Sequence, residues 1–356
     1  PWLSVVTNSS RRVWEWASTE RPVLADHTHG GSRSNLAVRV LACTPAFHDD
    51  DRCRAYPSGH KPAGLLHEYG ESGLMQFGLL TGSYDNSMAG GRLRKPVGPF
   101  SEEVNPDTGQ FTANAALVRS FDALRIRDYN NGYVRGIYRN TWKGGGPPQP
   151  GEFADWGNPV GEMMYEALRY FAGHATPTPE FGGGTLMDQA VGLPAAAWDD
   201  PFSATGKARA PRCARANLLV ISDTNLSYDT DQMPGAYPAF SAGTVSKPLA
   251  GFDATRELNA LSAAEPGVAG LHFIGQSGTL FDTAPSPKTV GSLASIRGLA
   301  PEEPTKQGGY TAAAAAWFGK RSDLRADLPG RQSVDTFTIA LASPLPRITV
   351  PMGAGR

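Results

Sequence analysis

Side chains that could bind a cation or another ligand first gather at residues 222–225, which read Ser-Asp-Thr-Asn. They follow residues 216–221 (ANLLVI), a short apolar run without helical spacing. Such a run, bounded by polar residues, is typical of a strand buried on both faces of a parallel sheet. Ligands of open α/β sheets bind beyond the carboxyl ends of these strands, so Asp223 is the first candidate functional residue. The structural alternative is that Asp223 caps a loop or helix after the strand.

Asn158 places a second oxygen-bearing side chain at the predicted start of a helix. Carboxylate and amide oxygens are hard ligands that suit Mg²⁺ or Ca²⁺, so Asp223 and Asn158 form a candidate metal site. Asp229 and Asp231 add a D-x-D pair of the kind that Ca²⁺ loops use, but two residues do not make a site. For this second pair, a solvated acidic loop is the favoured interpretation.

His27 and His29 have the H-x-H spacing found in some metal-dependent hydrolases, which makes such an enzyme the alternative function. No apolar strand precedes the pair to hold both imidazoles on one edge, so a solvated loop is favoured. The chain contains no H-E-x-x-H, P-loop or G-x-G-x-x-G motif, and its remaining histidines are scattered. The sequence therefore predicts a protein that is not an enzyme.

The three cysteines differ in what their positions predict. Cys43 and Cys53 flank a polar, Asp-rich loop, the kind of local loop that a disulfide closes in an oxidising compartment. Cys213 has no evident partner, and an odd cysteine in a secreted chain often pairs outside the segment in view. We expect a Cys43–Cys53 disulfide.

The composition sets the class of protein. The chain has 356 residues and a formal net charge of −1, which gives no reason to expect a nucleic-acid or anionic-membrane partner. Its 41 glycines and 29 prolines predict many turns around a modest regular scaffold. No apolar run approaches the ~20 residues that a membrane helix needs. The first residues, Pro1-Trp2-Leu3, contain neither an initiating Met nor a signal peptide, so we expect a fragment of a longer protein.

The predicted elements alternate along the chain, which favours a doubly wound, mostly parallel α/β sheet. Strands are expected at residues 36–43, 74–81, 216–221, 271–274 and 334–341, and helices at 64–71, 115–126, 158–173 and 311–320. We expect residues 1–356 to form one domain with long decorated insertions around 84–155, 174–212 and 228–310.

Four long stretches resemble the PilC/PilY family of type IV pilus proteins, in order along most of the chain. They are HKPAGLLHEYGESGLMQFGLLTGSYDN, DWGNPVGEMMYEALRYFAG, CARANLLVISDTNLSYDTDQMPG and SDLRADLPGRQSVDTFTIALASPLP. The part that they resemble is the von Willebrand factor A-like N-terminal region, which a β-propeller, absent here, follows in that family. The resemblance implies an extracellular protein, exported through the periplasm to the pilus tip or outer-membrane surface. It further implies a role in pilus assembly and adhesion, with minor pilins and a host or surface ligand as partners.

The resemblance also implies a function for the candidate metal site. A-domains of this type hold a divalent cation with a D-x-S-x-S loop, a Thr and an Asp. Asp223 matches the last of these, and Asn158 stands where the Thr is expected. No D-x-S-x-S is present, because the nearest stretch, Asp85-Asn86-Ser87-Met88-Ala89, has Ala in the fifth place. Metal binding by these residues alone is therefore expected to be weak.

Overall fold

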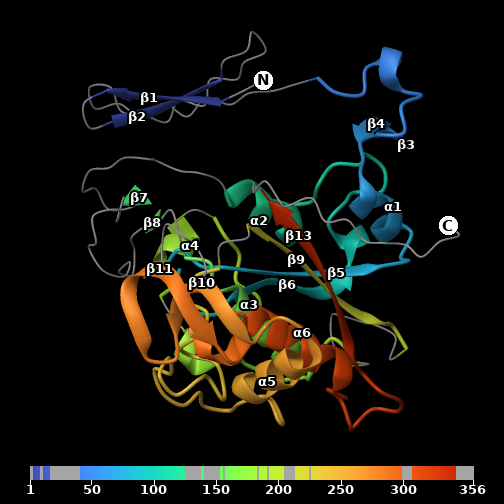
Figure 1. The fold of residues 1–356 in the computed structure, drawn as a ribbon. Helices are drawn as coiled ribbons and strands as arrows, with labels where there is room; N and C mark the ends of the chain where they lie inside the picture. Colours follow the sequence, from blue (N-terminus) through green and yellow to red (C-terminus); the bar gives the residue numbers. More distant parts are fainter. Residues whose placement is uncertain are drawn as a thin grey trace, which may run out of the picture.

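The structure is a computed structural model, and its described residues form a mixed α/β arrangement of short sheets and helices (Figure 1). The described residues are 3–8, 11–16, 41–124, 138–139, 153–154, 157–182, 184–190, 192–203, 213–223, 226–298 and 307–341. In this part of the chain, no helix is long and apolar enough to cross a membrane.

A parallel pair of strands, β9 (Ala216–Asp223) and β13 (Val334–Leu341), lies beside the main core. Both were expected from their apolar runs, and β13 has the predicted bounds. One face of β9 contributes Leu218 and Val220 to the core, where they pack near Val334 of β13. The expectation that β9 is buried on both faces is wrong, because every second residue is exposed, including Leu219 and Ile221.

Helix α3 (Val160–Phe171) runs through the centre of this core, as Figure 1 shows. Its apolar residues recur three and four positions apart, so Val160, Met164 and Leu168 all point into the core. The helix ends at Phe171, and Gly173 follows the capping residue Ala172 with a φ of +79°, the left-handed conformation that favours glycine. The sequence predicted this helix, although Pro159 and not Asn158 is the capping residue.

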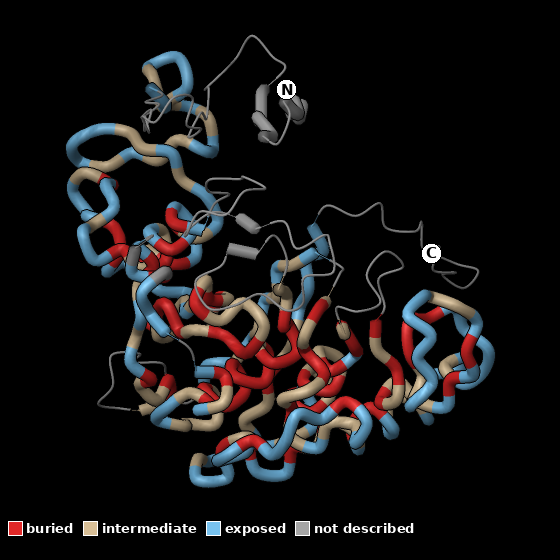
Figure 2. Tube along the Cα trace, turned by 90° about the vertical axis from the view of Figure 1, so that its left-hand side faces the viewer, coloured by how far each residue is buried: buried red, intermediate tan, exposed pale blue. Residues whose placement is uncertain are grey.

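Helix α6 (Thr311–Arg321) packs directly against α3. The two helices approach closely at Gly161, where a Cβ atom would lie 2.0 Å from Oγ1 of Thr311. Helix α5 (Ala254–Ala264) lies beside α6, and Asp253 caps its first turn by accepting a hydrogen bond from the amide of Arg256 at 2.7 Å. Buried residues gather in the interior of this main body, as Figure 2 shows.

An antiparallel pair, β5 (Gln76–Thr81) and β6 (Arg92–Pro99), forms a second layer. The predicted strand at residues 74–81 is therefore present, but its partner β6 is antiparallel and lies in the insertion expected around residues 84–155. Helices α1 (Leu65–Glu71) and α2 (Ala116–Ala123) flank this pair. Phe100, Val104 and Leu117 form their shared, smaller core.

A three-stranded antiparallel sheet occupies part of the region around 228–310. Its strands are β10 (Gly270–Ser277), β11 (Leu280–Val290) and β12 (Ile296–Arg297), in the order β11-β10-β12. Lys288 is buried in the hairpin, where its ammonium donates to the carbonyl of Ile274 at 2.9 Å and lies 2.8 Å from Asp282. The sequence predicted only residues 271–274 of β10.

The remaining described elements are short. They are β1 (Leu3–Asn8) with β2 (Arg11–Trp16), β3 (Cys53–Tyr56) with β4 (Gly59–Pro62), β7 (Tyr138–Arg139) with β8 (Phe153–Ala154), and α4 (Leu186–Ala190). Parallel pairing among the described strands occurs in β9–β13 and β7–β8, and the other pairs are antiparallel.

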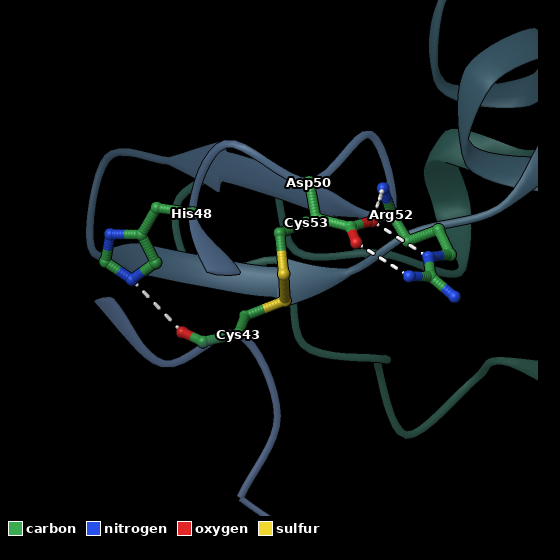
Figure 3. The surroundings of a disulfide bond; sticks show 5 residues. All are labelled: Cys43, His48, Asp50, Arg52 and Cys53. Atoms are coloured by element: carbon green, nitrogen blue, oxygen red, sulfur yellow. Dashed lines mark hydrogen bonds and ion pairs between the residues drawn. A yellow bond between two sulfur atoms is a disulfide. The ribbon is translucent and has the colours of Figure 1, made fainter. Parts of the chain in front are cut away.

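The predicted disulfide between Cys43 and Cys53 is confirmed in the structure, with the two Cα atoms 5.6 Å apart (Figure 3). Further contacts hold the loop that it closes. Nε2 of His48 lies 3.1 Å from the carbonyl oxygen of Cys43, and Arg52 forms an ion pair with Asp50 at 2.6 Å. The neighbouring hairpin β3–β4 lies far from helices α5 and α6 (Figure 1).

Loss of this disulfide in Cys53→Ser should destabilise the hairpin β3–β4 and leave the main core intact. Closing a loop of this length, with a sequence separation of 10, stabilises by roughly 2–3 kcal/mol. The measurement is native-state hydrogen exchange of Cys53→Ser against the parent chain. Faster exchange is expected in residues 53–62 and not in α3. Equal exchange in both proteins would contradict a stabilising role.

Candidate functional site

The carboxyl end of β9 meets the segment that leads into α3, and this junction contains both residues of the first candidate site. The side-chain amide of Asn158 donates hydrogen bonds to Oγ of Ser222 at 2.8 Å and to Oδ1 of Asp223 at 3.1 Å. Asp223 is exposed at the end of the strand. The structure therefore brings together Asp223 and Asn158, which lie 65 positions apart in the sequence.

The backbone of Asn158 is fixed by a residue of the loop that follows β9. Its amide donates to Oγ of Ser227 at 2.8 Å, and its carbonyl accepts from the amide of Ser227 at 3.1 Å. Gly157 precedes it with a φ of +140°, and a Cβ there would lie 2.3 Å from the carbonyl oxygen of Ser87. A glycine is therefore required at the entry to the site.

The chemistry of this junction is that of oxygen ligands. Asp223 offers a carboxylate, and Ser222 beside it offers a hydroxyl. The Asn158 amide presents its nitrogen to both, so a cation bound by Asp223 and Asn158 together requires this amide to turn over. Residues 224 and 225 lie outside the described residues. Across the part of the chain that the structure describes, no group of three or more His, Cys, Asp or Glu could hold a metal ion.

Asp229 lies in the core, so a solvated acidic loop is the wrong interpretation for this residue. It is 0% exposed. Its carboxylate accepts hydrogen bonds from the amide of Gly309 at 2.9 Å and from the hydroxyl of Thr311 at 3.0 Å. The amide of Gly161 also donates to it, so Asp229 connects the first turns of α3 and α6. Burial raises the pKa of Asp229 to about 7, although these hydrogen bonds lower it in part.

Glu162, in the first turn of α3, is a second buried carboxyl group near this position. It is fully buried, and its Oε2 accepts from the amide of Gly90 at 2.6 Å. Burial raises the pKa of Glu162 well above its usual range, and the nearby carboxylates of Asp231 and Asp229 raise it further. Burial also raises the pKa of Asp231. The structure thus makes Asp229 part of the connection between α3 and α6. Asp231, the other residue of the D-x-D pair, is half-buried.

A buried ion pair that sequence reasoning missed joins β6 to α4. Arg94 and Asp188 are 2.8 Å apart, with side chains 1% and 5% exposed. The guanidinium of Arg94 also donates to Thr81, Gly82 and Pro194, and the carboxylate of Asp188 accepts from Ser83 and from the amide of Tyr84. Asp85 accepts from the amide of Asp188 at 3.0 Å, so its carboxylate is part of the same buried network.

His27 and His29, the pair behind the hydrolase alternative, lie outside the described residues. Cys213 is an exposed free thiol.

Comparison with known proteins gives the family. The family model of the second domain of PilY1 homologues matches residues 77–319. A type IV pilus biogenesis factor PilY1 homologue from Xylella fastidiosa (strain Temecula1) is 37% identical over 386 aligned residues. That alignment covers 100% of this chain and 26% of the relative, so the chain spans about a quarter of the relative's length. No solved structure matches.

The matched range includes nearly all of β5, the whole of α3, Asp223 and most of α6. The resemblance to the PilC/PilY proteins drawn from the sequence is thereby confirmed. The chain belongs to the PilY1 homologue family.

Proposed function

We propose that this chain is a domain of a type IV pilus-associated protein that supports pilus biogenesis and surface adhesion without catalysing a reaction. The observation that carries this proposal is the match along the whole chain to a relative named as a type IV pilus biogenesis factor. The disulfide between Cys43 and Cys53 supports export to an oxidising compartment.

The fold in this proposal is von Willebrand factor A-like. Support comes from the parallel pair β9–β13, with α3 and α6 packed on one of its faces. Asp223 lies at the carboxyl end of β9, where ligands of open α/β sheets bind. The divalent cation is Mg²⁺ or Ca²⁺, and Asp223 and Asn158 supply two of its ligands.

The partners in this proposal are minor pilins and a host or surface ligand, and the location is the pilus tip or the outer-membrane surface. A bound cation with an open coordination position can take an acidic group of the partner. The remaining ligands come from a D-x-S-x-S loop of the complete protein, because residues 1–356 contain none.

Asp223→Ala is expected to abolish Mg²⁺ or Ca²⁺ binding and adhesion by the complete protein while its fold survives. The reason is that Asp223 is exposed and contributes its carboxylate to the cation and not to the core. The measurement is calorimetric titration of wild type and variant with each cation, with melting curves recorded beside it.

Asn217→Ala is the matched control, because Asn217 is an exposed residue of the same strand on the same face. It should bind metal as the wild type does. If Asp223 only fastens Asn158 to β9, Asp223→Ala instead lowers stability by about 1 kcal/mol, the value of a local cap, without a metal effect. Equal metal binding by wild type and Asp223→Ala would refute the assignment.

A further inference from the structure

The parallel pair β9–β13 carries five large apolar side chains that are exposed to solvent. Their exposed fractions are 55% for Leu219, 52% for Ile221, 57% for Phe337, 47% for Ile339 and 49% for Leu341. Isolated exposed apolar residues are common on protein surfaces, but a contiguous group marks a contact surface.

The strand register places these side chains on one face of the sheet. Leu219 pairs with Phe337, and Ile221 pairs with Ile339. Paired residues of neighbouring strands point to the same side, and alternate residues share that side. The five side chains therefore form one patch, the β9–β13 outer face, while Leu218 and Val220 point into the core on the opposite side.

An apolar face that the described residues leave about half exposed is unusual in a parallel sheet. Parallel strands are joined by crossover helices that cover the sheet, so their strands are normally buried on both faces. Here α3 and α6 pack on the inner face of the pair. In the part of the chain that the structure describes, the outer face stays about half exposed, although its composition is that of a buried surface.

The area of the patch favours a segment of the same polypeptide over a second copy of the chain as the group that covers it. Five aliphatic and aromatic side chains that are about half exposed offer roughly 500 Å². A stable dimer buries about 800 Å² on each partner, so this face is too small to hold a second copy by itself. A segment of the same polypeptide needs less area, because its effective concentration is high.

Polar groups border the patch at both ends. Asp335 precedes Phe337 by two residues and forms ion pairs with Arg215 at 2.7 Å and with Lys320. Asp223 lies at the other end, paired in register with Leu341. An amphipathic helix carries an apolar stripe flanked by polar residues, so its surface complements this face of the sheet.

We propose that the β9–β13 outer face is covered by an amphipathic helix of the same polypeptide that lies outside residues 1–356. The curated relative extends well beyond the matched region, since the alignment covers 26% of its length. The helix lies across Leu219, Ile221, Phe337 and Ile339 and completes the second helical layer of the parallel sheet.

Thiol labelling tests this directly. Ile339→Cys is prepared in a Cys213→Ser background, both in the complete gene product and in residues 1–356, because Cys213 is an exposed free thiol. The rate of reaction with a maleimide is then measured under non-reducing conditions. Phe273→Cys is the matched control, since Phe273 is an apolar residue of strand β10 that is 67% exposed.

Ile339→Cys is expected to react at least about tenfold more slowly in the complete product than in residues 1–356, because a packed helix must open before the reagent enters. Phe273→Cys should react at the same rate in both. Leu219→Cys repeats the test from β9 if Ile339→Cys does not fold. Equal rates for Ile339→Cys in both proteins overturn the proposal. Protection in residues 1–356 that grows with protein concentration also overturns it, because a second copy then covers the face.

Discussion

Arg94→Met is expected to lower the free energy of unfolding by about 3–5 kcal/mol, the usual cost of breaking a buried ion pair from one side. The substitution leaves the carboxylate of Asp188 in the interior without its counter-charge. It also removes the donors to the carbonyl oxygens of Gly82 and Pro194. The measurement is urea unfolding followed by near-ultraviolet circular dichroism.

Arg119→Met is the control, because Arg119 is exposed on α2 and its guanidinium donates to the carbonyl oxygen of Ala113 at the surface. Its cost should stay within ~0.5 kcal/mol. The double variant Arg94→Met/Asp188→Asn should be more stable than Arg94→Met, since it no longer buries an unpaired charge. If Arg94→Met costs no more than Arg119→Met, the pair does not stabilise the contact between β6 and α4.

The sequence predicts the parts of this fold that rest on local pattern. The apolar run at residues 334–341 has the bounds of β13, and the i, i+3, i+4 stripe from Val160 predicts α3. Helix α5 was not predicted, although a local signal for it exists, because Asp253 is a capping residue followed by Leu258 and Leu261. The disulfide of Cys43 and Cys53 is a local prediction of the same kind.

Burial of β9 could not be predicted, because an apolar strand looks the same whether both of its faces are covered or only one. Leu219 and Ile221 are as apolar as Leu218 and Val220, yet they lie on the exposed face. What decides between the two faces is the position of α3 and α6, which no local pattern contains.

The buried polar contacts were missed for a related reason. Arg94 and Asp188 are 94 positions apart, and Asp229 meets Gly309 over 80 positions. A carboxylate can be buried only if donors surround it, and here those donors come from distant parts of the chain. The D-x-D pair therefore looked like a solvated loop.

Asp229→Asn is expected to change the pH dependence of stability. The pKa of Asp229 is raised from 3.8 to about 7 in the folded state. A carboxyl group with a raised folded pKa binds its proton more tightly when folded, so its stabilising contribution is complete below pH 3.8. That contribution is lost as the pH rises through about 7, because the buried group must then carry a charge.

The variant removes this titration, while its amide oxygen can still accept a hydrogen bond from Gly309. The stability of wild type relative to Asp229→Asn should therefore fall by a few kcal/mol between pH 4 and pH 8, at ~1.4 kcal/mol for each unit of pKa. Taking the difference in unfolding free energy between wild type and Asp229→Asn cancels the pH dependence contributed by other groups. Glu162 is one of them, since its pKa is raised in the same direction.

Urea unfolding at intervals of one pH unit supplies the measurement. Asp122→Asn, on the exposed side of α2, is the control and should shift stability by no more than ~0.5 kcal/mol at each pH. A constant difference between wild type and Asp229→Asn across this range would mean that the hydrogen bonds from Gly309, Thr311 and Gly161 fully offset burial. Asp229 would then stay charged where α3 meets α6, and its negative charge would favour the first turns of both helices.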